Sequence, residues 1–111
     1  MQESLKTIKL ISELAAFVFK AGGKEFKVNF KEKNGTITIT IKSHLDNLAA
    51  SDLEKLRALN TPRQSQVEEY YWELAGENDQ YQELSLVGMM IDEAEFSYEN
   101  KLLTISVYRH K

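Results

Sequence analysis

The sequence has no cysteine, one proline and two histidines among its 111 residues. Without cysteine the chain can form neither disulfides nor thiolate metal sites, which is compatible with a reducing cytoplasm. Its most apolar stretch, residues 10–19, is interrupted by Ser12 and Glu13 and is far shorter than the roughly 20 apolar residues of a membrane span. The first residues also lack the basic segment and apolar run of a signal peptide. We therefore expect a cytoplasmic protein that does not cross a membrane.

Catalytic motifs with a known local pattern are missing as well. The sequence has no G-x-S-x-G and no H-E-x-x-H, and residues 21–24 (Ala-Gly-Gly-Lys) lack the spaced glycine and the Ser/Thr of a phosphate-binding loop. The net charge of −3 argues against nucleic-acid binding, because phosphate backbones select basic surfaces. We expect no catalytic residue, no cofactor and no metal, and the sequence favours a non-enzymatic protein.

Charge is divided unevenly along the chain. Residues 1–45 hold eight Lys against four Glu, a balance of +4, whereas residues 46–111 hold six basic against thirteen acidic residues, a balance of −7. Two interpretations follow from this complementarity. The halves can face each other within one fold, or two copies can pair in a head-to-tail or two-fold arrangement.

The segment 26–42 predicts a β-hairpin. Apolar residues alternate with polar ones on both sides of Asn34-Gly35, the dipeptide that best fits a tight turn with two positive φ angles. A two-residue loop pairs Phe30 with Ile39 and Val28 with Ile41, so the turn and the apolar pattern agree on the register. The other face of this hairpin consists of Lys and Thr.

The segment 92–108 repeats this pattern. Residues 96–107 align without a gap on residues 30–41, and Phe, Asn, Thr and Ile coincide. Lys101 then occupies the position of Gly35, in a conformation that costs a residue other than glycine about 1 kcal/mol. An internal repeat by duplication and convergence of two amphipathic hairpins both account for the similarity.

Helices are predicted between and before the hairpins. Residues 4–20 have helical spacing and end at Gly22-Gly23, and the wide apolar arc of this helix suggests cover on more than one side. Residues 51–60 begin with capping-box spacing at Ser51 and Glu54, which predicts a helix. A new helix is predicted at residues 62–75, with Thr61 as its N-cap and Pro62 as its first helical residue. Residues 79–91 fit a helix or a strand, and we favour a helix.

Together these elements predict a single α+β domain over residues 1–111. Two hairpins, at about 25–42 and 92–108, form one antiparallel sheet. The helices at about 4–20, 51–60 and 62–75, and the one favoured at 79–91, pack on one face of it.

Charged and aromatic residues supply the candidate contacts with a partner. Glu93 and Glu95 point to the polar face of their strand, where they can oppose Lys27 and Lys31 across the sheet or across a dimer. Trp72 lies off the buried stripe of its helix, as interface anchors do, although most such residues cover the edge of a core. Phe17, in the strongly apolar first helix, is the remaining candidate for partner binding.

His44 and His110 are separated by the same offset as the two hairpins. Equivalent positions at the ends of two strands could hold a metal together with Asp46 or Asp92. Two unrelated surface histidines explain the spacing more simply, because His110 is the penultimate residue and chain ends fray.

Our leading hypothesis is a non-enzymatic regulatory or protein-interaction module that acts as a homodimer. It rests on the missing catalytic motifs, the over-apolar first helix and the uneven charge. The alternative is a domain that binds a small ligand, or a minor enzyme, with a pocket between the sheet and the helices walled by Tyr70, Trp72 and Tyr98.

Overall fold

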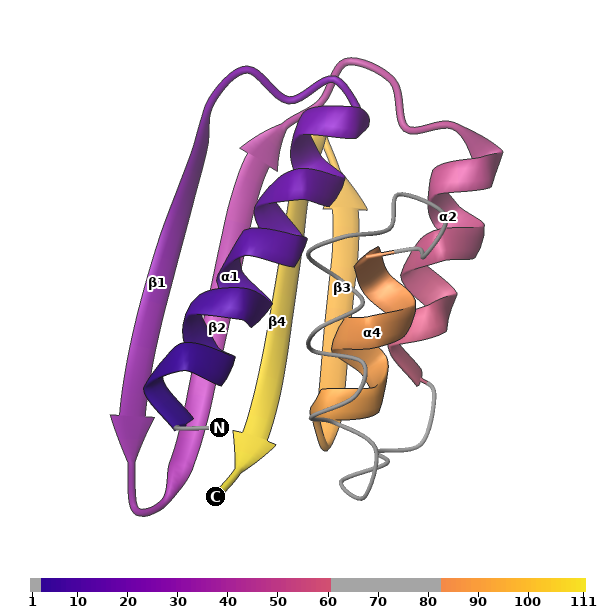
Figure 1. Cartoon of the computed structure of the whole chain (residues 1–111). Helices are drawn as coiled ribbons and strands as arrows, with labels where there is room; N and C mark the ends of the chain where they lie inside the picture. Colours follow the sequence, from indigo (N-terminus) through magenta and orange to yellow (C-terminus); the bar gives the residue numbers. More distant parts are fainter. Residues whose placement is uncertain (1–2, 61–82) are drawn as a thin grey trace.

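The computed structural model describes residues 3–60 and 83–111, and it has the predicted α+β class (Figure 1). A four-stranded antiparallel sheet carries helices on one of its faces. In chain order the elements are α1 (Glu3–Lys20), β1 (Phe26–Lys33), β2 (Thr36–His44), α2 (Ala50–Arg57), the 3₁₀ helix η1 (Ala58–Asn60), α4 (Glu83–Met90), β3 (Glu93–Glu99) and β4 (Leu102–His110). None of the described helices is both long and apolar enough to span a membrane.

α1 confirms the predicted helix at 4–20. It ends because Gly22 adopts a φ of 98°, a conformation that glycine reaches at little cost. The backbone N–H of Gly23 donates to the carbonyl of Val18 at 2.9 Å, so the last helical carbonyls are satisfied as the chain turns towards β1.

The first hairpin forms with the predicted register. Phe30 pairs with Ile39 and Val28 with Ile41 across β1 and β2. Asn34 and Gly35 have φ angles of 53° and 79°, as the predicted turn requires.

The second hairpin has the same construction. Asn100 and Lys101 have φ angles of 52° and 64°, so Lys101 does adopt the left-handed conformation predicted for it. Each residue of this hairpin stands 66 positions after its counterpart in the first, as Phe96 does after Phe30.

The sheet joins the two hairpins through their second strands, in the order β1-β2-β4-β3. This places the hairpins about a pseudo-two-fold axis between β2 and β4. Two hydrogen bonds at opposite ends of the β2–β4 pair, Leu45 N–H to the Lys101 carbonyl and Lys111 N–H to the Gly35 carbonyl, are equivalents under this axis, and both measure 2.8 Å. β1 and β3 are consequently the two edge strands.

α2 begins slightly earlier than predicted, and its cap is not the one expected. The sequence predicted a capping box from Ser51 to Glu54, but the backbone N–H of Ala49 donates to the Asp52 carboxylate at 3.2 Å. Glu54 instead pairs with Arg57 on the helix surface. The N-cap is therefore Ala49, two residues before the predicted cap, because Asp52 holds the position from which a carboxylate can reach back.

α4 confirms that the ambiguous segment is helical over Glu83–Met90. Its side chains are apolar around most of the helix, and Leu84, Leu86, Val87 and Met90 are all buried. A helix that is apolar on every side must be enclosed, and α4 lies beside α1 and α2 over the sheet (Figure 1). The helix predicted at 62–75 and residues 79–82 lie outside the described part of the chain.

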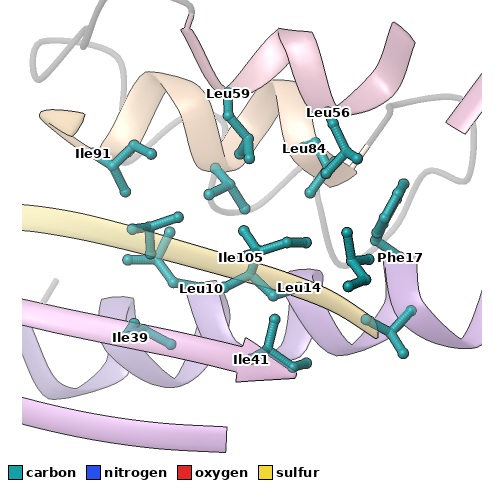
Figure 2. Packing of buried hydrophobic residues seen from close by; sticks show 14 of the residues in the cluster. Leu10, Leu14, Phe17, Ile39, Ile41, Leu56, Leu59, Leu84, Ile91 and Ile105 are labelled. Atoms are coloured by element: carbon teal, nitrogen blue, oxygen red, sulfur yellow. The ribbon is translucent and has the colours of Figure 1, made fainter. Parts of the chain in front are cut away.

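The core fills the space between the sheet and the helices (Figure 2). Leucines from α1, α2, η1 and α4 meet isoleucines from β2 and β4, and removing one such side chain typically destabilises a domain by about 2–5 kcal/mol. The labelled members are Leu10, Leu14, Phe17, Ile39, Ile41, Leu56, Leu59, Leu84, Ile91 and Ile105.

Candidate interaction site

The side of α1 that faces away from the core is apolar. Leu10, Leu14 and Phe17 are buried on the inner side, yet Ile8 and Phe19 on the outer side are 58% and 61% exposed. Solvent-facing positions of a surface helix are normally polar. The predicted cover on more than one side is therefore only partly present in the described structure, where α4 packs beside α1 and these two side chains stay accessible.

β1 carries apolar side chains that the helices do not cover. Val28 and Phe30 are 38% and 48% exposed although their cross-strand partners on β2 are buried. They lie on the helix-bearing face of the sheet, but β1 is an edge strand that extends beyond α1 (Figure 1). The alternation of apolar and polar residues in β1 is thus typical of a strand with one buried face, but the apolar side chains Val28 and Phe30 are exposed in the structure.

The helix residues and the strand residues meet where α1 leads into β1. The rings of Phe19 and Phe26 meet edge to face, with centroids 5.2 Å apart, and so connect the end of α1 to the start of β1. Ile8 precedes Phe19 by eleven residues, about three helical turns or about 16 Å, on the same side of α1. Phe30 follows Phe26 by about 13 Å along β1. We name the exposed residues Ile8, Phe19, Val28 and Phe30 the α1–β1 strip.

The other face of the sheet is polar, with positive charge at one edge and negative charge at the opposite edge. Lys27 and Lys31 lie on β1, and Glu93 and Glu95 lie on β3, at opposite edges of the sheet. β2 and β4 separate them with Thr, Ser and Tyr side chains and with Lys42, the cross-strand partner of Lys27, so these lysines and glutamates are not cross-strand neighbours within one chain. Their pairing across a dimer stays a prediction.

The aromatic candidates are distributed differently from the expectation. Phe17 is 1% exposed and belongs to the core, so the structure places it away from any surface a partner could reach. Tyr98 is half-buried, and its hydroxyl donates to the Leu45 carbonyl at 2.5 Å, which ties β3 to the segment after β2. Tyr70 and Trp72 lie outside the described residues, so the pocket walled by these three side chains stays a prediction.

The two histidines lie at opposite ends of the sheet, because β2 and β4 are antiparallel. His44 approaches the Asp46 carboxylate at 3.4 Å. The ring of His110 lies 3.0 Å from the Thr36 hydroxyl, and its backbone N–H donates to Asp92 at 2.6 Å. Because they lie at opposite ends of the sheet, the two histidines cannot hold one metal together with Asp46 or Asp92, and within residues 3–60 and 83–111 no group of three or more His, Cys, Asp or Glu is arranged to hold a metal.

Sequence reasoning missed an ion pair between a buried arginine, Arg109, and the partly exposed Glu3 at the start of α1. Arg109 is 2% exposed, and its guanidinium donates to both carboxylate oxygens of Glu3, at 3.0 and 2.8 Å, and to the Met90 carbonyl at 2.5 Å. The signal was present in β4, where Arg109 occupies the next inward position after Leu103, Ile105 and Val107. This fork-shaped contact fixes the first turn of α1 to β4 and the end of α4.

Shallow hollows occur on the polar face near the start of β1. One of about 370 Å³ is lined by Glu25, Lys27, Lys42, Ser43, His44 and Leu102. Its lysines are solvent-exposed, and Leu102 is an isolated apolar residue, so the hollow lacks the enclosed apolar walls of a typical ligand pocket.

A scan against protein-family models finds no match to this chain, and no curated protein shows significant sequence similarity to it. Function must therefore be argued from the surface itself, and the α1–β1 strip is its most unusual feature.

Proposed function

We propose that the protein is a non-enzymatic protein-interaction module that acts as a homodimer, with the α1–β1 strip as its contact surface. The observation that carries the proposal is the exposure of Ile8, Phe19, Val28 and Phe30 on two adjacent elements. Single exposed apolar residues are ordinary, but a contiguous apolar surface is typical of a site that another protein covers.

The chemistry of the described site supports binding over catalysis. The strip offers aromatic and branched aliphatic side chains, which supply contact area to a partner, and its members carry no titratable group. Association through such a surface is driven by the removal of apolar area from water, so raising the salt concentration should not weaken it.

Light scattering coupled to size exclusion tests the proposal. The wild-type chain should elute with twice the 12.8 kDa mass of one chain at micromolar concentration, at low and at high salt. Phe30→Glu and Ile8→Glu should shift it to the monomer, because each places a charge within the contact. A wild-type protein that is monomeric at every concentration would refute the homodimer.

Phe96→Glu is the matched control. Phe96 is 38% exposed on β3, on the same face of the sheet as Phe30 but at the opposite edge. This variant should keep the dimer mass and an unchanged circular dichroism spectrum. If Phe96→Glu dissociates the dimer as readily as Phe30→Glu does, the contact does not lie on the α1–β1 strip.

A further inference from the structure

β1 presents its backbone as well as its side chains to solvent. Lys33 and Thr36 flank the two-residue turn and form a hydrogen-bonded pair, so the odd-numbered residues of β1 direct their N–H and C=O groups towards β2. The even-numbered residues Phe26, Val28, Phe30 and Glu32 direct theirs away from the sheet. The residues with open backbone groups thus include the two strand members of the α1–β1 strip.

Resting on the function proposed above, we infer that two copies join through antiparallel pairing of their β1 strands, with Val28 on the two-fold axis. The two sheets then continue into one of eight strands. Val28 lies opposite the partner's Val28, and Phe30 lies opposite the partner's Phe26. Both pairs use the open backbone groups, and both place apolar side chains on the helix-bearing face, between the two α1 helices.

Charge and strand overlap together select this register among its neighbours, since a centre at Phe26 would pair only that residue of β1 with the partner's β1. With Val28 at the centre, Lys31 lies opposite the partner's Glu25, and Lys27 lies opposite the partner's Asn29, each twice per dimer. A centre at Lys27 would place this lysine opposite itself. A centre at Asn29 would place Lys27 opposite the partner's Lys31. A centre at Phe30 would place Lys27 opposite the partner's Lys33. Like charges directly opposite each other destabilise a strand pair.

At the other edge of the sheet, the three registers that pair most of β3 with its copy all place glutamates opposite each other. In two-fold pairing of β3, a centre at Phe96 places Glu93 opposite the partner's Glu99. A centre at Glu95 places this residue opposite itself, and a centre at Ser97 places Glu95 opposite the partner's Glu99. Pairing of β1 with a partner's β3 would match Lys with Glu, but this head-to-tail contact leaves a free edge at each end and grows into chains. Closed two-fold pairing through β1 avoids both the opposed glutamates and the growth into chains.

Cysteine cross-linking tests the register directly, because the natural sequence has no cysteine. Two hydrogen-bonded residues facing each other across antiparallel strands have Cα atoms about 5.5 Å apart, within the range of a disulfide. Val28→Cys should therefore form a disulfide-linked dimer on mild oxidation, as seen on a non-reducing gel. Lys27→Cys, Asn29→Cys and Phe30→Cys should cross-link at least tenfold more slowly. Faster cross-linking at one of these three positions would overturn the register.

A charge exchange gives an independent measurement. Glu25→Lys and Lys31→Glu should each weaken dimerisation about tenfold in sedimentation velocity at low salt, because each creates two like-charge pairs. The double variant should recover the wild-type affinity to within about twofold. Glu95→Lys, on the opposite edge, is the control and should have no effect.

The outcomes separate this inference from the function on which it rests. If Phe30→Glu dissociates the dimer but the charge exchange has no effect, the α1–β1 strip is the contact and the register is wrong. If mass grows continuously with concentration and Glu95→Lys stops the growth, pairing is head-to-tail and the two-fold dimer is refuted. A monomer under all conditions refutes the inference and the homodimer together.

Discussion

Thr40 and Ser106 face each other across β2 and β4, and their hydroxyl oxygens lie 3.0 Å apart. Ser106 stands 66 positions after Thr40, so each is the counterpart of the other under the pseudo-two-fold axis. The axis that relates the two hairpins passes between them, on the polar face of the sheet. A hydrogen bond between residues at equivalent positions of the two hairpins therefore lies where the hairpins join.

This hydrogen bond should couple the two hairpins energetically. Thr40→Val and Ser106→Ala should each lower the free energy of unfolding, and a double-mutant cycle should yield a coupling of about 0.5–1.5 kcal/mol. Urea denaturation of the four proteins measures it. The cycle formed by Thr38→Val and Ser106→Ala is the control and should be additive, since Thr38 is paired with Tyr108. Equal coupling in both cycles would mean that the Thr40–Ser106 bond contributes nothing specific.

Local patterns sufficed to predict both hairpins, the register of the first and the strained turn at Lys101, because alternation and turn chemistry act between neighbours in sequence. They did not predict the strand order, since the meeting of Thr40 with Ser106 depends on packing between residues far apart in the chain. The α1–β1 strip was foreseen only as an over-apolar helix. The alternation of Val28 and Phe30 indicated burial, and only the position of β1 at the sheet edge explains why they are exposed. Arg109 was missed because its partner, Glu3, lies at the other end of the sequence.

Lys101 is the clearest site for stabilising the fold. Its φ of 64° is strained for a side chain with a Cβ atom, so Lys101→Gly should raise the free energy of unfolding by about 1 kcal/mol. The reciprocal change, Gly35→Ala, should lower it by about the same amount, because φ is 79° and no atom within 4 Å would obstruct the new Cβ. Thermal denaturation of both variants checks the pair. A stabilising Gly35→Ala would show that φ strain does not control these turns.

The ion pair between Arg109 and Glu3 should stabilise the start of α1. Glu3→Gln keeps the shape of the side chain but removes the charge, and Glu3 is partly exposed, so we expect a loss of about 1–3 kcal/mol in the free energy of unfolding. Hydrogen exchange should locate the loss in the first turns of α1. The surface pair of Glu54 and Arg57 supplies the control, and Glu54→Gln should change stability by less than about 0.5 kcal/mol.

Gly23 sets the position of α1 against the sheet, and therefore the geometry of the α1–β1 strip. A Cβ at this residue would lie 2.5 Å from Val18 Cγ1, 2.8 Å from Ser43 Oγ and 3.0 Å from the Val18 carbonyl oxygen. The last of these is backbone and cannot rotate away, so Gly23→Ala must displace the end of α1, at a cost of about 1–3 kcal/mol.

Displacement of α1 would also alter the contact between Phe19 and Phe26 that links α1 to β1. Gly23→Ala should therefore weaken dimerisation as well as unfolding stability, measured by sedimentation velocity and urea denaturation. Gly22→Ala is the matched control. Its Cβ would meet nothing within 4 Å, so this variant should lose stability through φ strain while its dimer affinity stays unchanged. Equal loss of dimer affinity in both variants would mean that the strip tolerates movement of α1 and responds only to overall stability.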